Sequence, residues 1–345
     1  MTEGARGVLA VAVVAIVLAL VGCDVTFPQP GGPPDAAVAL DFDRFLERHH
    51  SPESPYEAPL EVGEHWVYRD AASSAGGATR EERVLATVNG GDGKECYLTQ
   101  ITLANGDVER QYLHRSADGL VLVAVDRGDG AELVAGAPLV LPLPLLGDAG
   151  PRGWSYDVLE QAFDAQVIFT ETLVLPSGTF RDCRKLKLWA MDAGGCRCHS
   201  SAEAEFRWYA PGVGLVKLVE GSRSFDLVTA SVLQAATTRV VGWEASGGSI
   251  VLGQGDRLIV QLPVALGDGC DWQAAVAPTA VLDLVDQADY ADVPSGGGVP
   301  HTGTHVATFA VAAAAVPVAG ASLSLIYGAA DAAGGYRFEL SVAIE

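Results

Sequence analysis

Turn signals recur at short intervals along this chain, and they constrain its fold more than any other feature of the sequence. Asn-Gly-Gly-Asp-Gly at 89–93 and Asn-Gly-Asp at 105–107 are typical of tight turns between antiparallel strands. Short runs rich in β-branched and aromatic residues occupy 65–68, 83–88 and 166–170. No segment keeps a 3.6-residue hydrophobic period over three turns, and 40 glycines and 18 prolines interrupt the chain. The sequence therefore predicts an all-β protein without parallel βαβ units.

The composition changes along the 345 residues and divides them into four parts. We expect a signal peptide at 1–22, a tether at 23–59, an antiparallel β domain at 60–235 and a β-sandwich at 237–345. The tether contains Pro-Gln-Pro-Gly-Gly-Pro-Pro, a composition that cannot bury a core. The last part holds about seven short strands separated by turns, which is what an immunoglobulin-like sandwich needs.

The chain is strongly acidic. Lysine and arginine together number 22, aspartate and glutamate number 43, and the net charge is −21. A protein that binds nucleic acid through its phosphates needs a basic surface, so nucleic acid is excluded as a partner. Anionic lipid headgroups would also repel this chain, so attachment to a membrane requires an anchor.

The amino-terminal residues can supply such an anchor. Residues 8–22 are uncharged and apolar; they are fewer than the roughly 20 that span a bilayer but suit a secretory signal. They end in Leu-Val-Gly before Cys23, a run that resembles the bacterial lipobox. The resemblance implies cleavage before Cys23 and its acylation; an uncleaved anchor helix is the alternative. In enteric bacteria an aspartate such as Asp24 favours the inner membrane, so we expect a lipid-anchored protein of the bacterial cell envelope on the periplasmic face of that membrane.

Five further cysteines lie in the exported part of the chain: Cys96, Cys183, Cys196, Cys198 and Cys270. In an oxidising envelope the usual partner of a cysteine is another cysteine. We predict a disulfide between Cys183 and either Cys196 or Cys198. Cys270 is either a free thiol or the disulfide partner of Cys96.

Metal binding and catalysis are not expected from the motifs. Cys183, Cys196, Cys198 and His199 could form a zinc cluster, but Cys-X-Cys-His lacks the usual gap between paired ligands. The sequence contains no Gly-X-Ser-X-Gly, no phosphate-binding Gly-X-X-X-X-Gly-Lys and no His-Glu-X-X-His. Gly-Cys-Asp-Trp at 269–272 does not match the signature around a papain-type nucleophile. We therefore predict no metal site, no cofactor and no enzymatic activity.

Two segments of the middle part resemble bacterial envelope lipoproteins of unassigned role. They are Leu-Pro-Ser-Gly-Thr-Phe-Arg-Asp-Cys at 175–183 and Trp-Tyr-Ala-Pro-Gly-Val-Gly-Leu-Val-Lys at 208–217. The resemblance implies a curved sheet of the kind found in periplasmic lipoprotein carriers, and it implies no activity.

The carboxyl-terminal part carries a more extensive likeness. Gly-Gln-Gly-Asp-Arg-Leu-Ile-Val-Gln-Leu-Pro at 253–263, Trp272, Gly-Thr-His-Val-Ala-Thr-Phe at 303–309 and Leu-Ile-Tyr at 325–327 follow one another at characteristic spacings. Together they resemble the chagasin family of papain-type cysteine peptidase inhibitors. The resemblance implies a sandwich in which three loops at one end fill a peptidase cleft without covalent chemistry.

This resemblance implies which residues would contact a peptidase. They are Ala265, Leu266, Gly267, Asp268, Gly269, Cys270 and Trp272 in the first loop, Pro300, His301, Thr302 and Gly303 in the second, and Gly328, Ala329, Ala330 and Asp331 in the third. Glycines here allow close approach to a partner or form ordinary turns, and Trp272 is of a type that more often fills a sandwich core.

The loops depart from the family at positions that matter for binding. The family has Asn-Pro-Thr-Thr-Gly-Tyr in the first loop and Arg-Pro-Trp in the third; here 265–270 read Ala-Leu-Gly-Asp-Gly-Cys, and 328–330 read Gly-Ala-Ala. Arginine and tryptophan are typical binding hot spots. We therefore expect a reversible inhibitor of papain-type cysteine peptidases with degenerate loops; the alternative is an envelope interaction or scaffold lipoprotein that does not inhibit.

The lipobox makes a direct prediction. Cells that express the full-length chain and grow with labelled palmitate should label the protein, because acylation requires the Cys23 thiol. The Cys23→Ala variant should stay unlabelled and keep its signal peptide, whereas Cys96→Ala should label normally. Equal labelling of the Cys23→Ala variant and the natural chain would rule out lipidation at this residue.

Overall fold

A computed structural model describes residues 60–72, 77–91, 93–128, 130–135, 137–142, 153–159, 161–191, 204–234, 236–267, 269–293, 299–313, 315, 317–328 and 336–345. The described residues form β-strands and two single-turn 3-10 helices, η1 (Ser231–Leu233) and η2 (Trp243–Ala245), so the all-β prediction is confirmed. Among them, no helix is long and apolar enough to cross a membrane. The expected signal peptide, lipidation site and tether lie outside the described residues.

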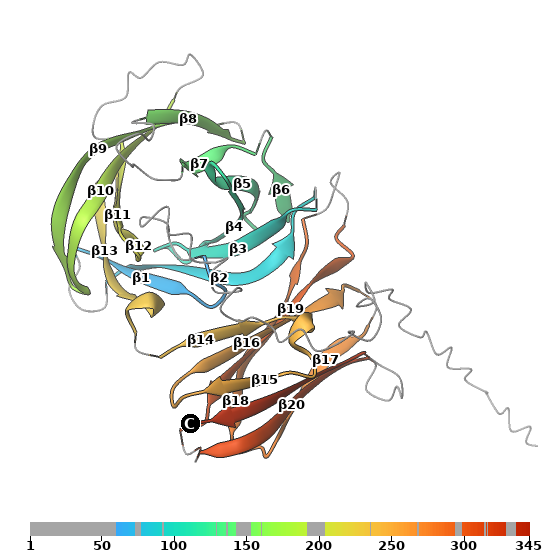
Figure 1. The fold of residues 1–345 in the computed structure, drawn as a ribbon. Coiled ribbons are helices and arrows are strands. Elements are labelled where there is room, and N and C mark those ends of the chain that lie inside the picture. Colours follow the sequence, from blue (N-terminus) through green and yellow to red (C-terminus); the bar gives the residue numbers. More distant parts are fainter. Residues whose placement is uncertain are drawn as a thin grey trace, which may run out of the picture.

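Thirteen strands form one sheet, here called the curved sheet, which curls through most of a circle (Figure 1). They are β1 (His65–Asp70), β2 (Thr79–Asn89), β3 (Glu95–Thr102), β4 (Val108–Ser116), β5 (Gly119–Asp126), β6 (Ala131–Leu133), β7 (Leu139–Pro142), β8 (Gly153–Val158), β9 (Gln161–Leu175), β10 (Gly178–Ala190), β11 (Glu205–Ala210), β12 (Gly214–Glu220) and β13 (Arg223–Ala230). Its order is β6-β5-β4-β3-β2-β1-β13-β12-β11-β10-β9-β8, and β7 pairs with β5.

The pairing of β1 with β13 joins the two ends of this part of the chain. The register places Trp66 opposite Ala230. Two buried side chains of β1 reinforce the closure by hydrogen bonding to the chain around β12: Trp66 Nε1 donates to the carbonyl of Val213 at 2.9 Å, and the Tyr68 hydroxyl donates to that of Leu215 at 3.1 Å. A buried indole or phenol needs such a partner, so these two residues fix the position of β1 against β12 as well as burying apolar surface.

Alternation along β10 shows how the sheet separates its two faces. Leu186 and Leu188 are buried, whereas Lys185 and Lys187 between them are only partly covered. The ammonium group of Lys185 lies 4.4 Å from the centre of the Trp208 ring and 4.7 Å from that of Phe206. The lysine therefore covers aromatic surface with its aliphatic stem and gains a cation–π contact while its charge remains near water.

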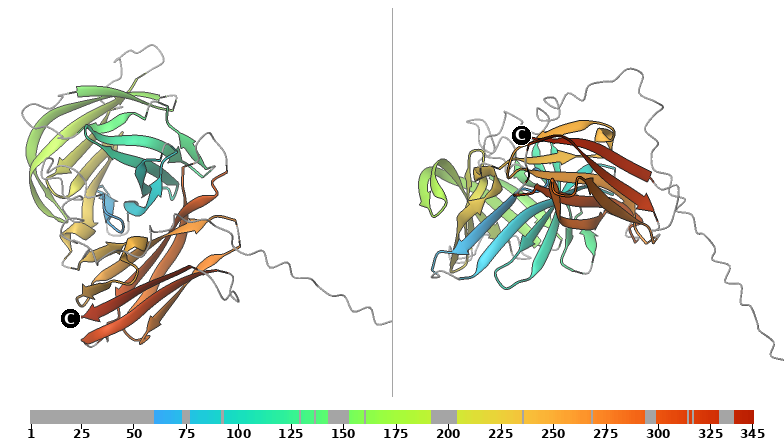
Figure 2. Two further views of the ribbon diagram at one scale, coloured as in Figure 1. Left: turned by 45° about the vertical axis from the view of Figure 1, so that its right-hand side comes forward. Right: turned by 90° about the horizontal axis from the view of Figure 1, so that it is seen from below.

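Eight further strands form a sandwich of two four-stranded sheets, seen in two orientations in Figure 2. They are β14 (Thr238–Val241), β15 (Ser249–Leu252), β16 (Arg257–Ala265), β17 (Asp271–Ala277), β18 (Leu282–Ala291), β19 (Thr302–Val311), β20 (Val318–Gly328) and β21 (Tyr336–Ile344). One sheet has the order β14-β16-β19-β18 and the other β15-β21-β20-β17. The short edge strands β14 and β15 pair in parallel with β16 and β21, a feature that the turn pattern did not predict.

The sandwich has its own buried cluster between the two sheets. Trp272, Phe309, Tyr327 and Phe338 are each no more than 1% exposed. Trp272 and Tyr327 are directly opposed in the β17–β20 pair, and their ring centres lie 5.2 Å apart. Ile259, by contrast, packs in the cluster that fills the curved sheet, so the two assemblies touch through apolar side chains.

Truncating this second cluster should destabilise the sandwich. Phe309→Ala should lower the free energy of unfolding by about 3–5 kcal/mol, because it removes a fully buried ring and leaves a cavity. The matched control Phe169→Ala removes a ring that is 45% exposed on β9 and should cost about 1 kcal/mol or less. Denaturant unfolding of the full-length chain measures both; equal losses for the two variants would contradict this assignment of the core.

Candidate functional site

The three expected loops leave the sandwich at the same end. In one sheet Ala265, at the end of β16, pairs with Thr302, and Ala291 of β18 pairs with Gly303. In the other sheet Asp271, at the start of β17, pairs with Gly328 at the end of β20. The segments 266–270, 292–301 and 329–335 therefore begin and end at one edge of the sandwich, which is called the loop end below.

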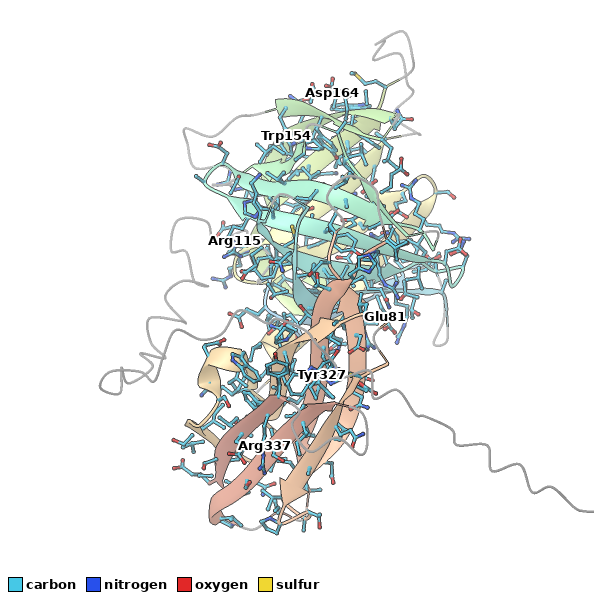
Figure 3. All side chains as sticks on the ribbon, turned by 90° about the vertical axis from the view of Figure 1, so that its right-hand side faces the viewer. Glu81, Arg115, Trp154, Asp164, Tyr327 and Arg337 are labelled. Carbon is cyan, nitrogen blue, oxygen red and sulfur yellow. The ribbon has the colours of Figure 1, made fainter. Side chains whose placement is uncertain are left out.

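Two sets of hydrogen bonds fasten the loop end. The Tyr327 hydroxyl donates to the carbonyl of Ala265 and accepts from its amide, both at 3.2 Å, and so connects the two sheets. The amide of Leu266 donates to the carbonyl of His301 at 2.8 Å and connects the first loop to the second. Tyr327 lies in the upper half of the sandwich in Figure 3, on the side towards the curved sheet. The loop bases are thus held together by a buried phenol and by backbone bonds.

Glycine is required in the first loop for backbone reasons. Gly267 has a φ of 84° and Gly269 a φ of 77°, both in the left-handed region that side chains disfavour. Added Cβ atoms would meet nothing within 4 Å, so the glycines face open space. They shape an exposed turn whose backbone a partner could approach closely.

Other expected contact residues point inward. Trp272 is 1% exposed, and its Nε1 donates to the carbonyl of Pro263 at 2.9 Å, so it fills the core. Gly303 is buried in β19, where a Cβ atom would lie 2.2 Å from the Tyr290 carbonyl oxygen. The close packing of neighbouring strands therefore explains why position 303 is a glycine.

The remaining expected residues divide by exposure. His301 and Thr302 are exposed, and Ala265, Leu266, Pro300 and Gly328 are partly covered. Asp268, Ala329, Ala330 and Asp331 lie outside the described residues. Thus Gly267, Gly269, His301 and Thr302 provide the open surface among the loop residues that the structure describes.

The second loop is also attached to the curved sheet. The Asn89 amide donates to Asp292 Oδ1 at 2.9 Å, and the amide of Val293 donates to the carbonyl of Asn89 at 2.9 Å. Asp292 Oδ2 also accepts from the Thr302 hydroxyl at 2.7 Å. Figure 1 shows β18 and β19 beside β2. Asn89 and Asp292 were missed by sequence reasoning because they are more than 200 residues apart and belong to no motif.

The cysteine predictions are wrong where the structure describes the residues. Cys96 and Cys183 are buried thiols, so Cys183 has no disulfide partner and Cys96 does not pair with Cys270. The Cys183 thiol donates to the carbonyl of Phe180 at 3.4 Å. Burial raises the pKa of Cys183 to about 11, which keeps the thiol protonated and unreactive at neutral pH.

Cys270 is neither a free thiol nor the disulfide partner of Cys96, which were the two alternatives that the sequence left open. It is disulfide-bonded, and the thiol of Cys96 excludes that residue as the partner. Cys196 and Cys198 lie outside the described residues. The pairing rule for exported cysteines failed for Cys96 and Cys183 because both side chains point into the apolar core, where a cysteine behaves as a small hydrophobic residue.

A hollow on the concave face of the curved sheet has a volume of about 290 Å³. Apolar side chains line most of it, together with a few charged groups. Arg80 is paired there with Glu82 and Glu220, both at 3.0 Å, and Arg207 is paired with Glu205. Burial alone would lower the pKa of Arg80, but the two carboxylates outweigh it and raise the pKa. The charged groups of this cavity therefore neutralise one another.

A larger hollow of about 1000 Å³ separates β18 from the curved sheet. Its walls carry five carboxylates and two guanidinium groups: Asp126, Glu132, Asp286, Asp289, Asp292, Arg83 and Arg110. Arg110 is partly engaged by Asp126 at 3.5 Å. The hollow is thus acidic and open to solvent along β18.

One group of side chains could hold a metal ion. Asp271, Asp289 and His305 each offer a ligand atom, and these atoms lie within 4.8 Å of one another. Sequence reasoning considered a metal cluster around Cys183 to His199 and the pair His49 and His50, where the candidate ligands are close in sequence. Asp271, Asp289 and His305 come from three different strands, so no spacing of residues in the sequence could reveal this group.

Comparisons with known proteins find only distant likeness. No family model and no curated protein matches the sequence. A cysteine protease inhibitor from Entamoeba histolytica is 16% identical and covers 32% of this chain and 99% of its own, with a TM-score of 0.29. Amebosin is 15% identical over 32% of this chain and 100% of its own, with a TM-score of 0.26. A candidate lipoprotein from Parabacteroides distasonis is 17% identical over 52% and 99%, with a TM-score of 0.23. At these TM-scores the likeness carries no argument about function.

The Tyr327 hydroxyl should contribute measurably to the stability of the loop end. Tyr327→Phe should reduce the free energy of unfolding by about 1–3 kcal/mol, because it removes both hydrogen bonds to Ala265. Tyr290→Phe is the matched control, since the Tyr290 hydroxyl makes no hydrogen bond within the described residues. Denaturant unfolding should show a loss only for Tyr327→Phe. Equal stability of the two variants would show that the hydrogen bonds between Tyr327 and Ala265 contribute little to the free energy of unfolding.

Proposed function

We propose that the sandwich is a reversible, non-covalent inhibitor of papain-type cysteine peptidases. Its loop end inserts into the peptidase cleft, with the first loop making the central contact through the backbone around Gly267 and Gly269. No nucleophile is needed, because inhibition of this kind depends on filling the cleft.

One observation carries this proposal: three loops start from one end of a rigid sandwich and are fastened there. The Tyr327 hydroxyl and the Leu266–His301 bond hold the loop bases in place. A loop whose base is fastened loses less conformational entropy when it binds, so a first loop with small side chains would retain affinity. The sequence likeness to chagasin-type inhibitors at 253–263, 303–309 and 325–327 supports the same proposal.

The affinity should be weak. Gly-Ala-Ala replaces an arginine and a tryptophan at 328–330. Each such anchor contributes about 2 kcal/mol in typical interfaces. Their joint absence corresponds to a loss of about a thousandfold in affinity.

The same proposal includes a location. An acylated Cys23 would hold the chain in the bacterial envelope, on the periplasmic face of the inner membrane, and residues 23–59 would serve as the tether. The lipobox likeness and the apolar run at 8–22 support this proposal. A peptidase exported to the same compartment would be the partner.

A second function is favoured by the contact between Asn89 and Asp292. The second loop is fixed at its base to the curved sheet through Asp292 and Val293. A loop held in this way has less freedom to enter a cleft. The chain would then be a non-inhibitory interaction protein of the envelope, in which the curved sheet and the sandwich act as one surface.

Titration against papain separates the two functions. The full-length chain should inhibit weakly and reversibly. The triple variant Gly328→Arg, Ala329→Pro, Ala330→Trp should bind about a thousandfold more tightly. The control Gly328→Ala, Ala329→Pro changes the same loop without adding either anchor and should leave affinity near that of the natural chain. If neither the natural chain nor the triple variant inhibits while both unfold at the same denaturant concentration, the interaction function is favoured.

A further inference from the structure

His305 is a buried histidine with an incomplete set of partners. It lies in β19 and is 2% exposed. Its Nδ1 is 2.6 Å from Asp289 Oδ1, which belongs to the directly opposed residue of β18. Its Nε2 is buried and has no hydrogen-bond partner among the described residues. Nδ1 is therefore the ring nitrogen that faces a carboxylate.

A second carboxylate reaches the same point from the opposite sheet. Asp271 is the first residue of β17 and is exposed. Its Oδ1 accepts from the Trp272 amide at 2.8 Å, which leaves Oδ2 for another ligand. The Trp272 ring packs beside the His305 ring, with centres 6.4 Å apart, and so brings β17 and β19 together here.

We propose that Asp271, Asp289 and His305 bind a divalent transition-metal ion of the zinc class. On loading, the one proton of the neutral imidazole would move from Nδ1, where it faces Asp289, to Nε2, and the Nδ1 lone pair would bind the ion. Nε2 has no hydrogen-bond partner among the described residues, so this transfer breaks no hydrogen bond at Nε2. One imidazole and two carboxylates make three protein ligands and leave a further position for water or a partner's side chain.

The geometry suits this assignment after a small movement. Ligand atoms around zinc lie about 2.0–2.2 Å from the ion, hence roughly 3.4 Å from one another. The three ligand atoms are now within 4.8 Å of one another. Asp271 is exposed, so its side chain can move closer, and the partly exposed Asp289 side chain can move away from Nδ1, which is now 2.6 Å from Asp289 Oδ1.

The ion can reach the site from solvent, and nearby carboxylates attract a cation. The Asp289 side chain is 36% exposed and lines the acidic hollow beside β18. Asp286 and Asp292 lie on the same wall. Imidazole together with carboxylate favours zinc, manganese or iron(II) over calcium, which prefers oxygen ligands alone.

Metal binding would tie the two sheets together directly beneath the first loop. Asp271 follows that loop in β17, whereas Asp289 and His305 belong to the facing sheet. The inference goes beyond peptidase inhibition and does not depend on it, because the ion is bound by the sandwich alone.

Cobalt(II) titration of the full-length chain, without thiol reductants, tests the site. We expect one Co²⁺ per chain with a visible absorption band that added Zn²⁺ abolishes, and a rise in melting temperature with Zn²⁺. Asp271→Asn and Asp289→Asn should each weaken binding at least tenfold. Asp283→Asn, an exposed residue of the same strand β18, is the matched control and should bind as the natural chain does.

Several results would overturn the proposal. One is the absence of stoichiometric Co²⁺ binding by a folded chain. Another is an Asp271→Asn variant with unchanged affinity. A third is a thiolate-to-cobalt charge-transfer band, which would place the ion at a cysteine. A fourth is loss of binding only on replacing the adjacent histidines His49 and His50 of the expected tether, which would place the ion there. Since Asp271 is exposed, its variant should fold normally and keep the test decisive.

Discussion

The antiparallel pairing of β1 with β13 is the interaction on which the rest of the structure depends. It joins two meanders, β1–β6 and β8–β13, into one curved sheet and is reinforced by Trp66 and Tyr68. It also brings the end of β13 next to the start of β1, where Ala230 lies opposite Trp66, and the chain leaves for the sandwich from there. Without that pairing, Asn89 and Asp292 would have no reason to meet.

The contact between the curved sheet and the sandwich has polar and apolar parts. The Thr87 amide donates to Gln261 Oε1 at 2.7 Å, and the Thr304 hydroxyl donates to the carbonyl of Thr87 at 2.8 Å. These bonds satisfy the backbone of β2 beyond the residues that pair with β1, which are 79–83. Ile259 and Val306 pack into the core of the curved sheet beside them. The contact holds the base of the second loop against the curved sheet and leaves the first loop exposed. The exposed first loop suits the proposed inhibition, whereas the attached second loop suits the proposed interaction function.

The loop end concentrates the chemistry of the sandwich in a small region. Tyr327 fastens its two sheets, Trp272 fills the space beneath, and His305 stands between that tryptophan and two carboxylates. The packing is dense and apolar on one side, whereas the side towards β18 opens into an acidic hollow.

The sequence by itself determined the fold class and much of the strand pattern. Turn residues and alternation predicted strands at 257–262 and 336–344, and β16 and β21 lie there, because these signals act between neighbouring residues. Only the tertiary structure decided which distant groups meet. The parallel edge strands, the Asn89–Asp292 contact, the buried thiols of Cys96 and Cys183, and the grouping of Asp271, Asp289 and His305 all depend on how sheets pack. Packing is a long-range property, since a residue's partners across a sheet or between sheets leave no local pattern in the chain.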